Sequence, residues 1–164
     1  MEKAYNLAMI YTSKNEKETQ KIAAELSQNL KSLKFKKSII VALEGELGAG
    51  KTVFTKGLAR VLGVREKIKS PTFVLMRKYK LVSKRFKNLK FLYHLDCYRL
   101  KDENDLINLG IKEILQVSHN IVVIEWADRV KKILPKKHIK IHIDHIDKNT
   151  RKIEIISKIK DLKV

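Results

Sequence analysis

The sequence predicts an α/β fold in which a mostly parallel central sheet is extended by antiparallel strands. Two observations lead to this prediction. Short apolar runs at residues 38–43 and 121–124 are rich in β-branched side chains, which is typical of strands buried on both faces, and helical patterns lie between them. Near the end of the chain, residues 137–143 and 151–156 alternate apolar and polar side chains, as half-buried antiparallel strands do. A chain of 164 residues suits a single domain over residues 1–164.

The first elements are a strand over residues 4–11 and a helix of about 18 residues. Ser13 and Glu16 have the capping-box spacing that begins such a helix. Its apolar face is predicted from positions that recur at helical intervals: Thr19, Ile22, Ala23, Leu26, Leu30 and Leu33. The buried strand over residues 38–43 comes next and leads directly to Gly45.

A second helix follows Thr52, because Phe54, Leu58, Val61 and Leu62 share one helical face and Gly63 is a natural helix end. Pro71 cannot continue a helix, so residues 69–72 are predicted to form a loop that enters a strand over residues 73–79. Residues 80–90 are basic and contain little that would form a core. We expect them to be an exposed hairpin connection, with a contact surface as the alternative.

The next predicted strand, residues 91–96, ends on Asp96. Asp102 is then a candidate N-cap for a short helix through Leu109, and a second short helix is expected over residues 111–115. The apolar strand after it ends on Glu125, and residues 144–150 form the turn between the last two strands.

The composition, with 44% hydrophobic and 33% charged residues, is that of a globular protein. No apolar run approaches the roughly 20 residues of a membrane span, and the first residues form no signal-peptide core, so no membrane is expected and the location is predicted to be cytoplasmic. A single cysteine, Cys97, excludes an internal disulfide, and no Cys/His cluster has zinc-site spacing.

The formal net charge of +18 is unusually high. A basic surface is typical of proteins that bind nucleic acids. However, the lysines are spread along the whole chain and greatly outnumber the arginines, which is also the bias that an AT-rich coding sequence imposes. Genome composition, which we favour, and affinity for RNA are therefore the two alternative explanations of the charge.

The most informative stretch is residues 45–52, Gly-Glu-Leu-Gly-Ala-Gly-Lys-Thr, which fills every fixed position of the phosphate-binding pattern G-x-x-x-x-G-K-[ST]. It stands between a predicted strand and a predicted helix, as that pattern requires. The glycines let several N–H groups point at one phosphate chain. Lys51 can neutralise terminal phosphate charge, and the Thr52 hydroxyl can bind Mg²⁺. The alternative is a glycine-rich turn that only joins strand to helix, and we favour nucleotide binding.

Asp96 and Glu125 each end a strand that could flank the loop strand, and ligands of open α/β sheets collect at that edge. A nucleotide with Mg²⁺ needs an acid near the metal and a group that orients a nucleophile. Strand-terminal acids also commonly cap turns. Trp126 is either a packed aromatic or a ring near the nucleotide. His94 fits a packed core histidine better than a ligand.

Together these motifs resemble the TsaE family, also called YjeE, the bacterial ATPase of tRNA threonylcarbamoyladenosine biosynthesis. The residues that carry the resemblance are Glu18-Thr19, the loop at 45–52, Ser70-Pro71-Thr72-Phe73, His94-Leu95-Asp96-Cys97-Tyr98-Arg99-Leu100 and Ile124-Glu125-Trp126-Ala127-Asp128. The resemblance implies a P-loop NTPase-like three-layer fold and an ATPase that uses ATP and Mg²⁺. It also implies action on the complex of TsaD and TsaB, which modifies adenosine 37 of tRNAs.

The resemblance further implies roles for single residues. Thr52 and Glu125 would hold Mg²⁺, Lys51 and Asp96 would be catalytic, and a switch-like loop of Ser70, Pro71 and Thr72 would sense the γ-phosphate. The expected nucleotide-binding residues are Glu46, Leu47, Gly48, Ala49, Gly50, Lys51, Thr52, Val53, Trp126 and Arg151. Val53 replaces a second threonine of many members, so a hydroxyl contact to the α-phosphate is missing there.

Two other functions are compatible with the sequence. A small-molecule kinase also uses such a phosphate loop, but it usually needs a lid with arginines, and residues 80–90 supply mostly lysine. A basic tRNA-binding module, whose docking the nucleotide only regulates, would use the positive charge.

Overall fold

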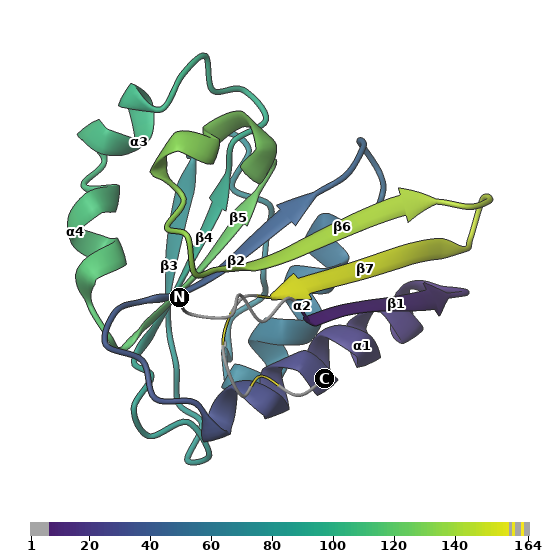
Figure 1. Cartoon of the computed structure of the whole chain (residues 1–164), viewed down its shortest axis with the longest axis horizontal. Helices are drawn as coiled ribbons and strands as arrows, with labels where there is room; N and C mark the ends of the chain where they lie inside the picture. The colour runs from purple at the N-terminus through teal and green to yellow at the C-terminus, as the bar shows by residue number, and fades with distance from the viewer. Residues whose placement is uncertain (1–6, 158, 160–161, 163–164) are drawn as a thin grey trace, which may run out of the picture.

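A seven-stranded sheet forms the centre of the computed structural model, which describes residues 7–157, 159 and 162 (Figure 1). Its strand order is β1-β7-β6-β2-β5-β4-β3. The strands are β1 (Leu7–Ser13), β2 (Ile39–Glu44), β3 (Met76–Lys80), β4 (Phe91–Asp96), β5 (Asn120–Glu125), β6 (Ile139–His145) and β7 (Arg151–Ser157). The central strands β6, β2, β5 and β4 are parallel, and β7 and β3 join antiparallel. The predicted fold class is confirmed.

Helices cover both faces of this sheet (Figure 1). One face carries α1 (Glu16–Asn29), the short 3₁₀ helix η1 (Leu30–Ser32) and α2 (Lys51–Leu62). The other carries α3 (Asn104–Asn108), α4 (Ile111–Gln116) and η2 (Ala127–Ile133). No helix in the described part of the chain combines the length and the apolar character that crossing a membrane requires.

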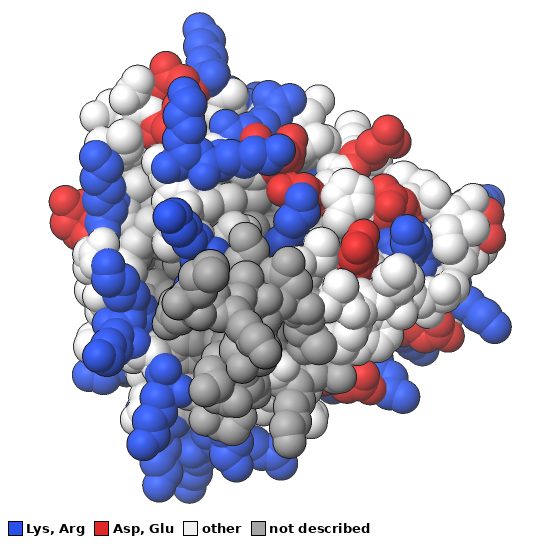
Figure 2. Space-filling view, viewed as in Figure 1, with Lys and Arg blue, Asp and Glu red and all other residues white. Residues whose placement is uncertain are grey.

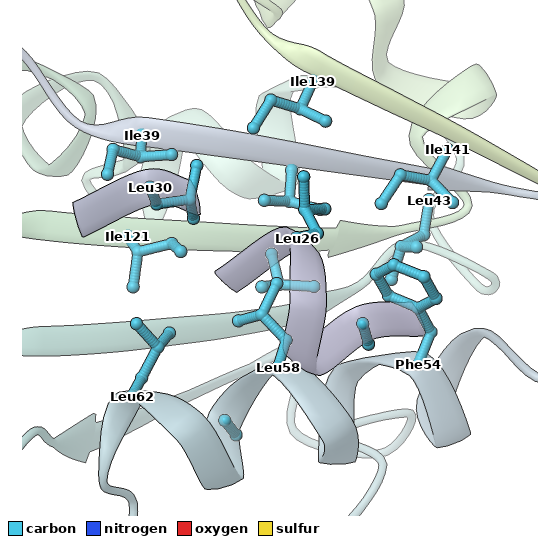
Figure 3. Packing of buried hydrophobic residues seen from close by; sticks show 14 of the residues in the cluster. Leu26, Leu30, Ile39, Leu43, Phe54, Leu58, Leu62, Ile121, Ile139 and Ile141 are labelled. Atoms are coloured by element: carbon cyan, nitrogen blue, oxygen red, sulfur yellow. The ribbon is translucent and has the colours of Figure 1, made fainter. Parts of the chain in front are cut away.

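Alternation along the buried strand β2 divides the core into two layers. Ile39, Val41 and Leu43 pack with the α1 and α2 side chains, whereas Ile40 and Ala42 pack with those of α3, α4 and η2. Figure 3 shows the first layer, in which Leu26 of α1 and Leu58 of α2 meet under the sheet. Burial on both faces explains why β2 is apolar from Ile39 to Leu43 and β5 from Ile121 to Ile124.

Helices α1 and α2 approach closely at Gly57 in α2. A Cβ on this residue would lie 2.5 Å from the backbone oxygen of Gln20 in α1, so the contact is backbone against backbone. Because α2 begins at Lys51, this packing also positions the glycine-rich loop, residues 45–50.

The predicted start of α1 is wrong. Ser13 is still paired with Arg151 in the sheet, so the helix begins later, after Asn15. The Asn15 side chain accepts a hydrogen bond from the N–H of Glu18 (3.0 Å), and the Glu18 carboxylate accepts one from the N–H of Lys14 (2.7 Å). The capping arrangement therefore lies two residues beyond the predicted one. Residues 4–6 of the predicted first strand lie outside the described residues.

Two predictions about the segment around β3 are also wrong. Strand β3 begins at Met76 and not at Phe73, because the N–H of Val74 bonds to the carbonyl of Pro71 and Leu75 has a φ of 60°. The connection from β3 to β4 is a hairpin as predicted, but Leu81 and Phe86 are buried in the core against α1 and α2. This connection folds back over the helices and therefore contributes to the core.

Candidate nucleotide site

The glycine-rich loop, residues 45–50, connects β2 to α2 at the carboxyl end of the central strands. Gly45 has a φ of 137°, and a Cβ there would overlap the carbonyl oxygen of Ile143, so only glycine fits this position. A cleft of about 380 Å³ opens beside the loop. Its lining residues are Glu16, Leu47, Gly48, Gly50, Lys51, Thr52, Val53, Ser70, Thr72, Asp96, Tyr98, Glu125 and Trp126. The cleft has the size of a small-molecule site.

Most of the predicted site residues therefore lie in one cleft, although they come from four separate segments. Four do not line it, namely Glu46, Ala49, Pro71 and Arg151. Glu16, the first residue of α1, does line it and was not predicted. No sequence pattern around Glu16 would have identified it, because its place depends on how α1 packs beside the loop.

Lys51 is buried at the centre of the loop. Its Nζ donates hydrogen bonds to the carbonyl oxygens of Gly45 (2.6 Å) and Glu46 (2.7 Å) and lies 3.8 Å from the ring centroid of Trp126. Burial lowers the pKa of Lys51, and the nearby carboxylates, Glu125 foremost, oppose this effect. The structure thus keeps a cation inside the cleft, where the sequence pattern predicts a phosphate contact.

Thr52 and Glu125 contact each other directly. The Thr52 hydroxyl donates to a Glu125 carboxylate oxygen over 2.9 Å, and Glu125 is only 2% exposed. Hydroxyl and carboxylate oxygens are hard ligands that suit Mg²⁺. No group of three or more His, Cys, Asp or Glu among the described residues would hold a metal by itself. The usual Mg²⁺ site of nucleotide enzymes has one or two carboxylates and completes its shell with phosphates and water.

The other oxygen of Glu125 is bound by two buried side chains. His94 Nε2 lies 2.7 Å from it, and the Thr55 hydroxyl lies 3.3 Å away. Because a carboxylate only accepts, we assign the proton to His94 Nε2. His94 is fully buried in β4, as a packed histidine, and its Nδ1 finds no partner among the described residues. Its contact with Glu125 was not predicted. The available signal was a polar residue within an otherwise apolar strand, two positions before Asp96.

Asp96 connects the cleft to the predicted switch-like loop. One of its oxygens accepts hydrogen bonds from the hydroxyls of Ser70 (3.0 Å) and Thr72 (2.6 Å), and the other accepts from the N–H of Tyr98 (3.0 Å). Pro71, between the two hydroxyl residues, is buried. A displacement of this loop would therefore change the position or the hydrogen bonding of Asp96.

Trp126 has features of both predicted alternatives, a packed aromatic and a ring beside the cleft. It packs partly against the core and also lines the cleft, and its ring centroid lies 4.9 Å from that of Tyr98. Its φ of 59° is unusual for a large side chain. Since Leu75 beside the switch-like loop also has a positive φ, both such non-glycine residues of the described chain flank the cleft, which is where strained backbone usually accompanies function.

Two arginines contact groups other than acids. Arg151 Nε donates to the carbonyl of Ala49 (3.1 Å), so this residue holds the back of the phosphate-binding loop from the start of β7. Arg99 lies over the exposed ring of Phe73, 4.5 Å from its centroid.

Comparison with known proteins identifies the relatives of this chain. The family model described as "Threonylcarbamoyl adenosine biosynthesis protein TsaE" matches residues 13–153. The tRNA threonylcarbamoyladenosine biosynthesis protein TsaE of Haemophilus influenzae is 36% identical over 133 residues, which cover 81% of this chain and 79% of that protein. TsaE of Rickettsia conorii is 36% identical over 153 residues, covering 93% and 80%.

A solved structure, the crystal structure of YdiB from Bacillus subtilis, superposes with a TM-score of 0.72 at 28% identity. The match covers 98% of this chain and 92% of that one, so the similarity extends over the whole sheet and both helical layers. The matched range of the family model includes the glycine-rich loop, Asp96 and Glu125. The chain belongs to the TsaE family of tRNA threonylcarbamoyladenosine biosynthesis proteins.

Proposed function

We propose that this chain binds ATP with Mg²⁺ and hydrolyses it as an accessory subunit for the formation of threonylcarbamoyladenosine at position 37 of tRNAs. In this proposal it acts in the cytoplasm on the complex of TsaD and TsaB. The observation that carries the proposal is the hydrogen bond between Thr52 and Glu125 beside the buried ammonium group of Lys51. A phosphate-binding cation and a pair of Mg²⁺-type ligands lie in one cleft.

Each part of the cleft has a role in this proposal. The N–H groups of the loop and the N-terminus of α2 bind phosphate oxygens, as helix N-termini do for anions. Lys51 stabilises negative charge on the terminal phosphates. When bound, Mg²⁺ would be held by Thr52 and Glu125 and would neutralise charge on the transferring group. His94 and Thr55 keep the Glu125 carboxylate in place.

Asp96 is the residue that we propose to orient the attacking water. Its carboxylate borders the cleft and already accepts hydrogen bonds from Ser70 and Thr72. The same two hydroxyls are suited to contact a γ-phosphate. A γ-phosphate contact would therefore release or reposition Asp96, which links phosphate sensing to the hydrolytic group.

The test of the proposed site is the variant Lys51→Ala, with Lys56→Ala as its control. Lys56 is an exposed lysine of the same helix. We expect Lys51→Ala to reduce ATP turnover at least about 100-fold, because removal of one transition-state contact typically costs this much. Lys56→Ala should behave like the wild type. Turnover is measured with and without TsaD and TsaB, and wild-type turnover by folded Lys51→Ala would show that the assigned site is wrong.

The partner assignment has its own experiment. Co-elution of the chain with TsaD and TsaB on size-exclusion chromatography is measured with ATP, with ADP and without nucleotide. We expect co-elution to depend on the nucleotide, because the switch-like loop bonds to Asp96 in the cleft and is also partly exposed to a partner, at Ser70. Equal co-elution in all three conditions would contradict this coupling.

A further inference from the structure

Part of the positive charge of the chain gathers at one end of the molecule without acidic neighbours in the sequence. Two stretches of sequence, residues 26–43 and 67–95, contain no Asp or Glu. They supply a set of exposed cations, here called the basic end: Lys31, Lys34, Lys36, Lys37, Lys80, Lys84, Arg85, Lys87 and Lys90. None of these side chains forms an ion pair with any residue in the described ranges, whereas Lys132 and Lys140 elsewhere do.

Backbone contacts show that the two stretches lie together. The N–H of Ser38 bonds to the carbonyl of Leu115, and the N–H of Lys90 bonds to the carbonyl of His119. Both contacts are at the amino ends of the parallel strands, where β2 and β4 flank β5. In Figure 2, blue side chains without red ones gather at the lower left, where Figure 1 shows η1 and the connection between β3 and β4.

The nucleotide cleft lies at the opposite end of the same strands. Its acids, Asp96 and Glu125, end β4 and β5, and Glu44 ends β2. The sheet therefore separates the end that carries these carboxylates and the cleft from the end where the exposed cations of the basic end gather. A polyanion at the basic end would not compete with a nucleotide for the loop.

The side chains at the basic end suit a nucleic acid better than a protein. Lysine is depleted in protein interfaces, whose centres are apolar, whereas protein surfaces that bind nucleic acids are polar and strongly positive. Val82, at 42%, is the large apolar side chain of these two stretches that is exposed at this end. A groove of about 690 Å³ among Lys34, Lys36 and Lys37 has apolar walls, but its side chains Leu33 and Phe35 are only half-buried and the cations surround it. In contrast, Leu47 (72% exposed) and Phe73 (82% exposed) lie around the nucleotide cleft.

The connection between β3 and β4 also has a hollow of about 360 Å³ that four lysines line, namely Lys80, Lys84, Lys87 and Lys90. Its floor includes the buried residues Leu81 and Phe86. Because these two residues anchor the connection in the core, the lysines project from a defined backbone. Lysine contacts phosphate as a point charge and reads no base, so this surface suits an RNA backbone independent of sequence.

We propose that the basic end binds the phosphate backbone of RNA, and specifically of tRNA, directly and independently of the nucleotide site. The choice of tRNA follows from the family to which the chain belongs. The proposal goes beyond the ATPase function and does not require it.

The experiment measures binding of a fluorescently labelled tRNA transcript by anisotropy at several salt concentrations, with the purified full-length chain. The test variant replaces four lysines of the basic end: Lys80→Gln, Lys84→Gln, Lys87→Gln and Lys90→Gln. The control variant removes the same charge from exposed lysines of α1, α2 and α4: Lys17→Gln, Lys21→Gln, Lys56→Gln and Lys112→Gln. A general effect of net charge would weaken both variants equally.

We expect the wild type to bind tRNA with a steep salt dependence. The test variant should bind at least about tenfold more weakly at low salt, and the slope of log affinity against log salt should fall by about 3 to 4. The control should keep most of the affinity and the slope. Equal losses in both variants, or no binding of tRNA by the wild type, would overturn the proposal.

Two further arms separate this proposal from its competitors. Stronger binding to an acidic protein, or to vesicles with anionic lipids, than to tRNA at the same salt would also overturn it. The variant Lys51→Ala should lose ATP turnover and keep tRNA binding. If the RNA proposal is wrong, the chain hydrolyses ATP but does not bind tRNA through the basic end. If the ATPase proposal is wrong, the chain binds tRNA but does not hydrolyse ATP.

Discussion

His94 provides a sharp test of how the cleft is built, because among the described residues its side chain hydrogen-bonds to Glu125 alone. Replacing it by leucine, His94→Leu, removes the donor that lies 2.7 Å from the Glu125 carboxylate and keeps an apolar side chain in a fully buried position. Glu125 would keep the Thr52 contact at 2.9 Å and the weaker Thr55 contact at 3.3 Å. The carboxylate would therefore lose its shortest hydrogen bond and its fixed orientation.

The size of the effect follows from this contact. A hydrogen bond to a charged group contributes about 1.5–3 kcal/mol, and groups that orient a metal ligand typically change metal affinity by about 10- to 100-fold. We expect the Mg²⁺ concentration for half-maximal ATP turnover to rise by about 10- to 100-fold in His94→Leu. The affinity for ATP without Mg²⁺ should change little, since Lys51 and the loop are untouched.

The assay uses the single tryptophan of the chain, Trp126, which lines the cleft. Its fluorescence is titrated with ATP in the presence and absence of Mg²⁺, and turnover is titrated with Mg²⁺. The matched control is His94→Gln, which retains an amide donor and should recover much of the Mg²⁺ dependence. An unchanged Mg²⁺ requirement in folded His94→Leu would refute the reasoning, and so would an equal loss of binding with and without Mg²⁺.

Three more predictions concern the surroundings of the cleft. Gly57→Ala should lower the free energy of unfolding by about 1–3 kcal/mol in a denaturant titration, because its Cβ would overlap the backbone of Gln20; a gain in stability would show that the helices can separate without cost. Cys97 is buried, and burial first and then nearby acids raise the pKa of its thiol to about 12. It should therefore resist a thiol reagent at pH 8 until the protein unfolds. The stability that this thiol contributes should be complete below about pH 9 and decline as the pH rises toward 12. Arg151→Ala should weaken ATP binding by about tenfold without changing the Mg²⁺ requirement, since it removes one charge-assisted hydrogen bond to Ala49, and calorimetry would detect this loss.

The parts of the fold that the sequence predicts well are those that local patterns determine. Strand β4 has the predicted bounds, and β2 and β5 differ from the prediction by one residue at each end, because their apolar runs have sharp polar borders. The predicted start of β3 was wrong because residues 73–75 are apolar, which predicts a strand, whereas their backbone forms a turn. The buried side chains Leu81 and Phe86 were missed because lysines surround them in the sequence.

The contacts within the cleft depend on strand order, which local patterns do not contain. The motif predicted which residues approach the loop, but not that His94 binds Glu125, nor that Arg151 holds Ala49. Each of these pairs joins segments that are distant in the sequence, and the sheet alone brings them together. The sequence alone likewise did not show where on the molecule the positive charge gathers. Only the arrangement of the strands shows that parts of the acid-free stretches, residues 31–38 and 80–90, meet at the end opposite the loop.

The two acids of the cleft are direct neighbours in the sheet, since Asp96 and Glu125 are register partners in β4 and β5. Neighbouring carboxylates repel each other unless donors separate their charge. Here the donors form two distinct sets, because Ser70 and Thr72 bind Asp96 whereas Thr52, Thr55 and His94 bind Glu125. A ligand that draws the hydroxyls of Ser70 and Thr72 away from Asp96 would leave its charge less compensated beside Glu125, and a divalent cation at Glu125 would then become more favourable. In the proposed mechanism, phosphate sensing by the switch-like loop and Mg²⁺ binding at Glu125 would thus be linked through the pairing of β4 and β5.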